Sequence, residues 1–203
     1  MTQNSIIKNK LRIAVTGGIG SGKSTVTNII EEDGYYTVGF DDVYHELLGD
    51  EKFVLGICEV VGVKPVYLDG KAVLDRPAVS EKVFNNSVLL DKLNAYTHEK
   101  ITNAAFKKGD ESGRRIVFYE VPLLFESGLE NLFDKVIVVM RDRTERIASA
   151  ALRDGRSFEE TALRAEKQFD YENNDLSLHI VILNDGDIES LKRKVRKVLG
   201  EIR

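Results

Sequence analysis

The sequence predicts an α/β protein in which helices flank a parallel sheet, and two observations support this fold class. Apolar runs recur along the chain, at residues 12–16, 35–40, 115–121, 135–140 and 179–183, and most are continuous rather than alternating. Strands of a parallel sheet are covered on both faces, so they are apolar throughout. The segments between these runs have helical periodicity or the length for it, which is typical of such folds.

The first strand leads into a glycine-rich loop and a helix. Residues 17–24 read GGIGSGKS and fit the phosphate-binding pattern G-x-x-x-x-G-K-[ST] at every fixed position. Val26, Ile29 and Ile30 follow at helical spacing. Glycine lets backbone N–H groups approach an anion, and the helix N-terminus adds a partial positive charge. We therefore expect a nucleoside triphosphate to bind here, on a parallel sheet of the P-loop NTPase type.

Individual roles follow from this loop. Lys23 supplies a mobile charge for the β- and γ-phosphates, and the Ser24 hydroxyl is the expected ligand of Mg²⁺. The residues expected to bind the nucleotide, which we take to be ATP, are Gly18, Ile19, Gly20, Ser21, Gly22, Lys23, Ser24 and Thr25.

Two acidic residues, Asp41 and Asp42, follow the second strand. In a parallel α/β sheet the carboxyl end of this strand lies at the edge that carries the phosphate loop and binds ligands. One of the two carboxylates could accept a proton from an attacking hydroxyl. The alternative is that one or both cap the next helix, because Asp is favoured at the N-cap.

The stretch between residues 42 and 114 contains no convincing strand of the core sheet. About seventy residues are far more than one crossover helix needs, so we expect a helical insertion beside the sheet. We assign residues 64–113 to this insertion and expect it to bind the substrate.

Glu120 lies near the end of the third strand, which is otherwise apolar. A carboxylate in this position needs a partner or water at the sheet edge. Two interpretations stay open: a role near Mg²⁺, or a structural carboxylate that holds a nearby basic group.

A segment rich in arginine follows the fourth strand. Arginine presents a planar fork that suits phosphate oxygens, so we expect a lid over the triphosphate, assigned to residues 145–178. The alternative is a solvated helix face on which several arginines pair with nearby acidic residues. The six arginines are Arg141, Arg143, Arg146, Arg153, Arg156 and Arg164.

The fifth strand precedes a basic helix with an apolar stripe, which predicts a surface helix packed on the core. The stripe is formed by Leu191, Val195, Val198 and Leu199. The nucleotide-binding core therefore comes in three parts, at residues 1–63, 114–144 and 179–203.

Composition narrows the function classes. The 203 residues carry a net charge of −4, which argues against a general nucleic-acid binder. A single cysteine excludes an internal disulfide framework, and no apolar run approaches the roughly 18 residues of a membrane span. We expect a cytoplasmic enzyme with a small-molecule substrate.

Two blocks of sequence together resemble the dephospho-coenzyme A kinase family. The run TGGIGSGKS extends from Thr16 to Ser24, and the more distinctive E-x-P-L-L-F-E block extends from Glu120 to Glu126. The resemblance covers nearly the whole chain. Further agreement lies at Asp69-Gly70, Asp75-Arg76, Val83-Phe84, Arg153-Asp154, Arg164 with Gln168, and Asn184.

The resemblance implies transfer of the ATP γ-phosphate to the ribose 3′-hydroxyl of dephospho-CoA, giving CoA and ADP, which is the last step of CoA biosynthesis. Asp42 matches the acceptor-side aspartate, and Arg153 is the expected phosphate contact of the lid, so that Asp42, Lys23 and Arg153 form the catalytic set. Asn184 is expected to bind the nucleotide. The residues expected to bind the substrate are Asp42, Arg76, His98, Glu120, Pro122 and Leu123. We expect a monomer or a weak homo-oligomer.

Three positions depart from the family pattern. Phe40 stands where an Asp usually begins the D-A-D motif, Glu99 follows His98 where Pro is common, and Ser149 replaces a usual arginine. Two alternatives therefore stay open: another P-loop small-molecule kinase, or a nucleotide-binding protein with weakened catalysis. A GTPase switch is disfavoured because no N-K-x-D tetrapeptide occurs.

Overall fold

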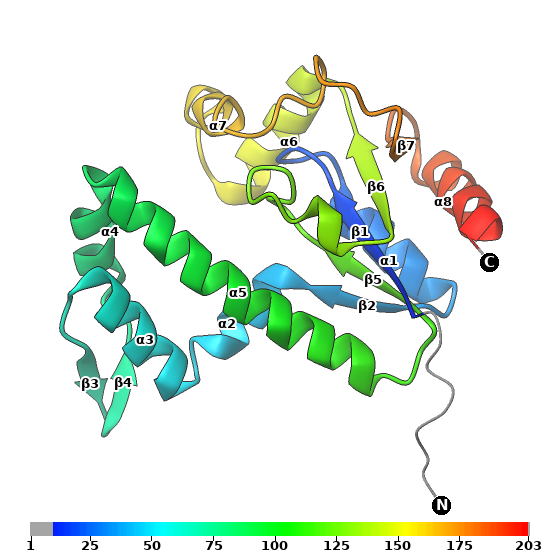
Figure 1. Cartoon of the computed structure of the whole chain (residues 1–203). Coiled ribbons are helices and arrows are strands. Elements are labelled where there is room, and N and C mark those ends of the chain that lie inside the picture. Colours follow the sequence, from blue (N-terminus) through cyan, green and yellow to red (C-terminus); the bar gives the residue numbers. More distant parts are fainter. Residues whose placement is uncertain (1–9, 203) are drawn as a thin grey trace, which may run out of the picture. The chain divides into compact units, whose positions relative to one another are not determined.

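The computed structural model describes residues 10–202, which divide into two compact units (Figure 1). The first unit comprises residues 10–39 and 109–202, and the second comprises residues 40–108. The described helices include none that is both long and apolar enough to cross a membrane.

The first unit is built on a five-stranded parallel sheet with the order β2-β5-β1-β6-β7 (Figure 1). The strands are β1 (Leu11–Thr16), β2 (Tyr36–Gly39), β5 (Ile116–Glu120), β6 (Lys135–Met140) and β7 (Ile180–Leu183). All five expected strands are confirmed to within one residue at each end. This order places β1, and with it the loop that follows, at the centre of the sheet.

Helices α1 and α8 bury their apolar stripes against this sheet. Val26 and Ile30 of α1 and Leu191 and Val195 of α8 share one core cluster with Ile13 of β1. The predicted apolar stripe of the C-terminal helix is therefore confirmed. The helical elements of this unit are α1 (Lys23–Glu32), α6 (Arg143–Asp154), α7 (Phe158–Ala165), α8 (Ile188–Ile202) and the short 3-10 helix η1 (Glu130–Leu132).

The second unit is mainly helical and also contains an antiparallel pair of short strands. Its elements are α2 (Phe40–Leu47), α3 (Glu51–Val61), β3 (Val66–Leu68), β4 (Lys71–Val73), α4 (Arg76–Phe84) and α5 (Ser87–Glu111), the last of which extends into the first unit. Asp69 and Gly70 join the two strands with positive φ angles of 49° and 78°. Asp and Gly tolerate this backbone region better than most residues do.

The second unit begins earlier in the chain than the insertion expected from the sequence. That insertion starts at residue 64, whereas the unit starts at Phe40. The physical reason is the core of the unit, in which Phe53 and Ile57 of α3 cluster with Val79 of α4. A helix that buries its apolar face against α4 belongs to the same unit as α4.

Candidate active site

The phosphate loop lies between β1 and α1 and has the backbone that its glycines predict. Gly20 and Gly22 have φ angles of 71° and 98°, in the region that favours glycine. The Ser21 N–H donates to the Gly18 carbonyl at 3.1 Å, which closes the loop on itself. Gly22 occupies the N-cap of α1 and offers no side chain to the first turn, so the N-terminus of the helix is suited to an anion.

Lys23 opens α1 and folds back over the loop. Its Nζ donates to the carbonyls of Gly17 at 2.8 Å and Gly18 at 3.1 Å. The ammonium group of Lys23 therefore lies beside the loop. A phosphate bound there would replace the two backbone carbonyl oxygens as the hydrogen-bond acceptor of Lys23.

Glu120 lies next to the phosphate loop because β5 pairs with β1, with Val15 opposite Glu120. Its Oε1 accepts from Ser24 Oγ at 2.9 Å and its Oε2 accepts from Thr27 Oγ1 at 3.0 Å. Both hydroxyls belong to α1. The structure thus gives Glu120 two hydroxyl partners on α1, one of which is the expected Mg²⁺ ligand.

Asn184 reaches the loop from the opposite side of β1, directly after β7. Its Nδ2 donates to the Ser21 carbonyl at 2.9 Å, and its own N–H donates to the Met140 carbonyl at 2.7 Å. A Cβ on Gly22 would overlap the Asn184 amide. The structure therefore brings Asn184 together with the loop residues that the sequence predicts.

A cavity of about 310 Å³ opens at the carboxyl ends of β6 and β7. Met140 and Leu183 give it apolar walls, and Arg141 and Asp185 give it charged ones. Ligands bind at this edge of a parallel sheet. Its mixed lining suits a group that is flat and apolar on its faces and polar at its rim.

Arg153 lies in the last turn of α6 with its side chain 64% exposed, and it already has an anionic partner. Its Nε and Nη2 donate to the two carboxylate oxygens of Asp154 at 2.8 and 3.3 Å, and Arg164 approaches the same carboxylate at 3.7 Å. The hydrogen bond from Arg153 lowers the pKa of Asp154, and it also raises the pKa of Arg153. Both groups are therefore held in their charged forms.

Other arginines of the segment have separate partners, as the alternative interpretation of a paired helix face predicts. Arg143 Nη2 lies 3.7 Å from Glu166, and Arg141 donates to both Glu145 and Ser149. The Arg141 to Ser149 hydrogen bond, at 2.8 Å, places a guanidinium beside the position where the family usually carries one on residue 149 itself.

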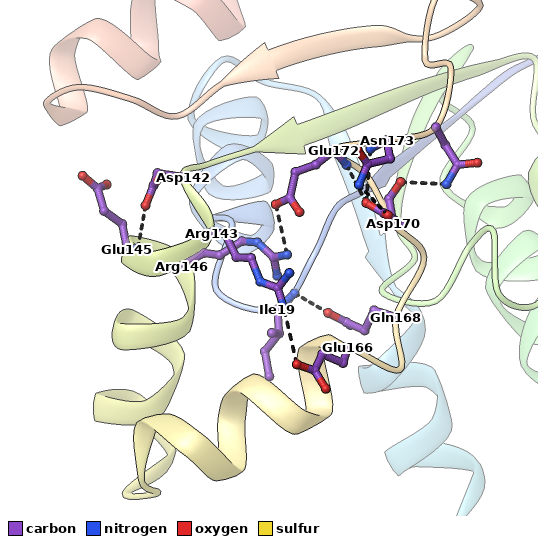
Figure 2. Close-up of polar contacts among 11 residues, drawn as sticks. Ile19, Asp142, Arg143, Glu145, Arg146, Glu166, Gln168, Asp170, Glu172 and Asn173 are labelled. Carbon is purple, nitrogen blue, oxygen red and sulfur yellow. Dashed lines mark hydrogen bonds and ion pairs between the residues drawn. The ribbon is translucent and has the colours of Figure 1, made fainter.

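The segment after α7 contacts the phosphate loop (Figure 2). Gln168 Oε1 accepts from the Ile19 N–H at 2.7 Å, and the hydroxyls of Tyr171 and Thr16 lie 3.3 Å apart. Burial raises the pKa of Tyr171 to about 12, so its hydroxyl stays protonated. Agreement with the family pattern marked Gln168, but no sequence signal singled out Tyr171.

The remaining predicted substrate residues lie in two places. Pro122 and Leu123 follow β5 in a run of turns, with Leu123 exposed. Asp42, Arg76 and His98 belong to the second unit: Asp42 is exposed in the first turn of α2, Arg76 begins α4, and His98 lies on α5. Burial lowers the pKa of His98, which favours the neutral imidazole.

The three departures from the family pattern have clear structural settings. Phe40 is buried at the start of α2, where a carboxylate would need a partner. Glu99 is exposed on α5 and pairs with Lys100 at 3.3 Å. Ser149 accepts the hydrogen bond from Arg141.

The family model for dephospho-CoA kinase matches residues 11–190 of the chain. The chain belongs to the dephospho-CoA kinase family. A dephospho-CoA kinase from Corynebacterium glutamicum is 32% identical over 196 residues, which are 95% of this chain and 97% of that protein. One from Chlorobaculum tepidum is 35% identical over 194 residues, 93% of each chain.

Two solved structures are similar to this chain over nearly its whole length. The crystal structure of TT1252 from Thermus thermophilus has a TM-score of 0.81 and 29% identity, and the match covers 97% of this chain and 100% of that one. The dephospho-CoA kinase from Campylobacter jejuni has a TM-score of 0.66 and 29% identity, over 94% of this chain and 96% of that one. As a member of the dephospho-CoA kinase family, the protein is a kinase with a P-loop fold.

Gly20→Ala is expected to damage this kinase severely. A Cβ at Gly20 would overlap the backbone carbonyl of Arg146, so α6 or the loop must shift, in addition to the strain of a φ of 71°. Left-handed strain alone costs about 1–2 kcal/mol. We expect a loss of ATP affinity and a fall in the thermal midpoint, measured by calorimetry.

Gly34→Ala is the matched control, because Gly34 also has a positive φ of 89° and its Cβ would meet open space. It should lower the free energy of unfolding only by the cost of placing alanine in the left-handed region, and it should leave the ATP affinity unchanged. Equal effects of the two substitutions on ATP binding would contradict the close approach of the loop to α6.

Proposed function

We propose that the protein transfers the γ-phosphoryl group of ATP to the ribose 3′-hydroxyl of dephospho-CoA, forming CoA and ADP in the last step of CoA biosynthesis. The observation that carries this proposal is the contact of Ser24 with Glu120 beside a phosphate loop already lined by Lys23. Phosphoryl transfer needs little more from a protein than positioning and charge stabilisation. Membership in the family supports the choice of acceptor.

In this proposal the loop from Gly18 to Thr25 surrounds the triphosphate with backbone N–H groups, and Lys23 turns from the loop carbonyls to the β- and γ-phosphates. The adenine enters the cavity at the ends of β6 and β7, where Met140 and Leu183 pack on its faces. Asn184, held by the Ser21 carbonyl, fixes the loop against this cavity.

The chemistry of the site also fits Mg²⁺. Hydroxyl and carboxylate oxygens are ligands that Mg²⁺ accepts, and the structure places Ser24 Oγ beside the Glu120 carboxylate. Ser24 would hold the ion, with Glu120 orienting the hydroxyl. Mg²⁺ supplies charge neutralisation on the β- and γ-phosphates.

The acceptor side of the proposal rests on Asp42, which takes the proton of the 3′-hydroxyl as the new bond to phosphorus forms. Arg76 and His98, from the same unit as Asp42, bind the dephospho-CoA. Glu120, Pro122 and Leu123, after β5, contact it from the sheet edge. Exposed Leu123 offers an apolar surface to the acceptor.

Arg153→Lys tests the lid, for which we propose residues 145–178. Lysine keeps the charge but cannot offer the planar fork that Arg153 now presents to Asp154, so we expect kcat to fall at least about 10-fold. Arg193→Lys, on the exposed face of α8, is the control and should change kcat little. Binding of an ATP analogue should increase the protection of backbone amides from hydrogen exchange more across residues 145–178 than across α8. Equal protection in the two regions, together with a wild-type kcat for Arg153→Lys, would refute the lid.

The activity is tested by coupled detection of ADP release with and without dephospho-CoA, together with chromatographic identification of CoA. We expect release of ADP that depends on dephospho-CoA. Parallel reactions with nucleosides, nucleotides and shikimate test for another small-molecule kinase. ATP binding without turnover on any acceptor would leave a nucleotide-binding protein with weakened catalysis.

We also propose that the enzyme works in the cytoplasm as a monomer or a weak homo-oligomer, with no nucleic acid or membrane partner. The acidic net charge of −4 and the single cysteine support this setting. Light scattering across a range of protein concentrations determines the oligomeric state, and a stable complex at low concentration would contradict the proposal.

A further inference from the structure

Arg146 stands apart from the other arginines of its segment because it is buried, with 6% of its surface exposed. It lies on α6 and points toward the phosphate loop, and its Nη2 donates to Glu172 Oε1 at 3.3 Å (Figure 2). Arginine is rarely buried without a strong reason, because its charge must be removed from water.

Two parts of Arg146 touch the phosphate loop. A Cβ placed on Gly18 would lie 2.6 Å from Nη1, and a Cβ placed on Gly20 would overlap the backbone carbonyl oxygen. Neither loop position has room for a side chain while Arg146 is present. The guanidinium thus fills the space directly under the start of the loop.

A small cavity of about 10 Å³ separates the guanidinium from the rest of the loop, and Gly18, Ser21, Arg146 and Glu172 are among its lining residues. Ser21 Oγ and Arg146 Nη1 are both buried, and neither has a hydrogen-bond partner among residues 10–202. A cavity needs at least roughly 10–15 Å³ and two or more polar partners to hold one water, so this cavity has room for a single water molecule at most. Such a water would accept from Nη1 and bond to the Ser21 hydroxyl.

We propose that Arg146 is a positioning residue for the triphosphate, which holds the phosphate loop through Gly18 and through one buried water shared with Ser21. Glu172 fixes the guanidinium, so the segment after α7 is coupled to the shape of the loop. Glu172 pairs with Nη2, so the Nη1 donors, which lie nearest Gly18, direct their positive charge toward the start of the loop. The role in catalysis rests on the function proposed above, whereas the role in nucleotide binding stands without an acceptor.

The test compares Arg146→Met with the wild-type protein in three measurements: the Kd of Mg·ADP by calorimetry, the KM values of both substrates, and the thermal midpoint. Loss of a charged hydrogen-bonding group should raise the ADP Kd and the ATP KM about 10- to 100-fold. The KM of dephospho-CoA should stay within about twofold of the wild-type value, because Arg146 acts on the phosphate loop and the loop binds the nucleotide rather than dephospho-CoA. Arg146→Lys should restore only part of the affinity, since one ammonium cannot reach both Glu172 and the water.

Leu199→Ala on α8 is the stability control, because it opens the core cluster away from the loop. It should lower the thermal midpoint and leave the ADP Kd unchanged at a temperature where the protein is folded. An ADP Kd of Arg146→Met within about twofold of wild type would overturn the proposal and leave Arg146 as a structural ion pair.

Gly18→Ala keeps the proposal falsifiable if Arg146→Met does not fold. Alone, it should displace the guanidinium and raise the ADP Kd, and an ADP Kd within about twofold of wild type would overturn the proposal. Where Arg146→Ala folds, the double substitution should bind ADP no more weakly than Arg146→Ala alone, because the group that the new Cβ collides with is gone. Additive effects of the two substitutions would overturn the proposal. ADP binding that responds as expected in a protein that does not phosphorylate dephospho-CoA would leave this inference standing and reject the proposed function.

Discussion

Lys23→Ala is expected to lower phosphoryl transfer at least about 10³-fold with the fold intact, because in the proposed function Lys23 is the cation that reaches the transferring phosphate. The structure explains why the fold should survive. Lys23 Nζ donates to the carbonyls of Gly17 and Gly18 within its own loop, so the substitution leaves the core of the sheet untouched. Steady-state ADP release measures the rate, and circular dichroism with a thermal scan checks the fold.

Lys192→Ala is the control, because it also removes a lysine side chain but one that forms only a peripheral ion pair, with Glu32 at 3.3 Å. Peripheral pairs contribute roughly 0–1 kcal/mol, so turnover should stay near that of the wild type. Turnover of Lys23→Ala within about tenfold of wild type would reject the assignment of the phosphate loop.

Asp42→Asn is expected to lower kcat by about 10²- to 10⁴-fold, the usual contribution of a general base, with a much smaller change in the ATP KM. Asn keeps the size and polarity of the side chain but cannot take the proton of the 3′-hydroxyl. Asp42 is exposed in the first turn of α2, so the substitution should cost little stability. Single-turnover kinetics separate the chemical step from product release.

Asp41→Asn is the matched control, because Asp41 is the preceding residue in the same exposed turn. A loss of kcat in Asp41→Asn alone would transfer the role of the base to Asp41. Values of kcat near wild type in both variants would mean that the loose transition state needs no protein base.

The strands and the phosphate loop could be predicted because their signals are local. A continuous apolar run predicts a strand buried on both faces, and all five such runs in the first unit are strands. The motif from Gly17 to Ser24 predicts its own backbone, since left-handed positions such as Gly20 and Gly22 require glycine. The apolar stripe of α8 predicted its packing in the same way.

The extent of the second unit was less predictable. Helix α3 has a strongly apolar face, but periodicity does not tell which neighbour that face will cover. The partner turned out to be α4 rather than the sheet, through Phe53, Ile57 and Val79. The sequence did not indicate the β3 and β4 pair either, because strands of three residues are too short to show a periodic pattern.

The sequence by itself determined the parallel sheet, the phosphate loop and the family of this kinase, because each depends on residues that are close along the chain or on a motif of fixed spacing. Only the tertiary structure decided which distant residues meet that loop. The strand order β2-β5-β1-β6-β7 brings Glu120 to Ser24 and Asn184 to Ser21. The packing of α6 decided that Arg146 lies buried under Gly18, because the six arginines share one residue type and only the docking of the elements determines which of them is buried.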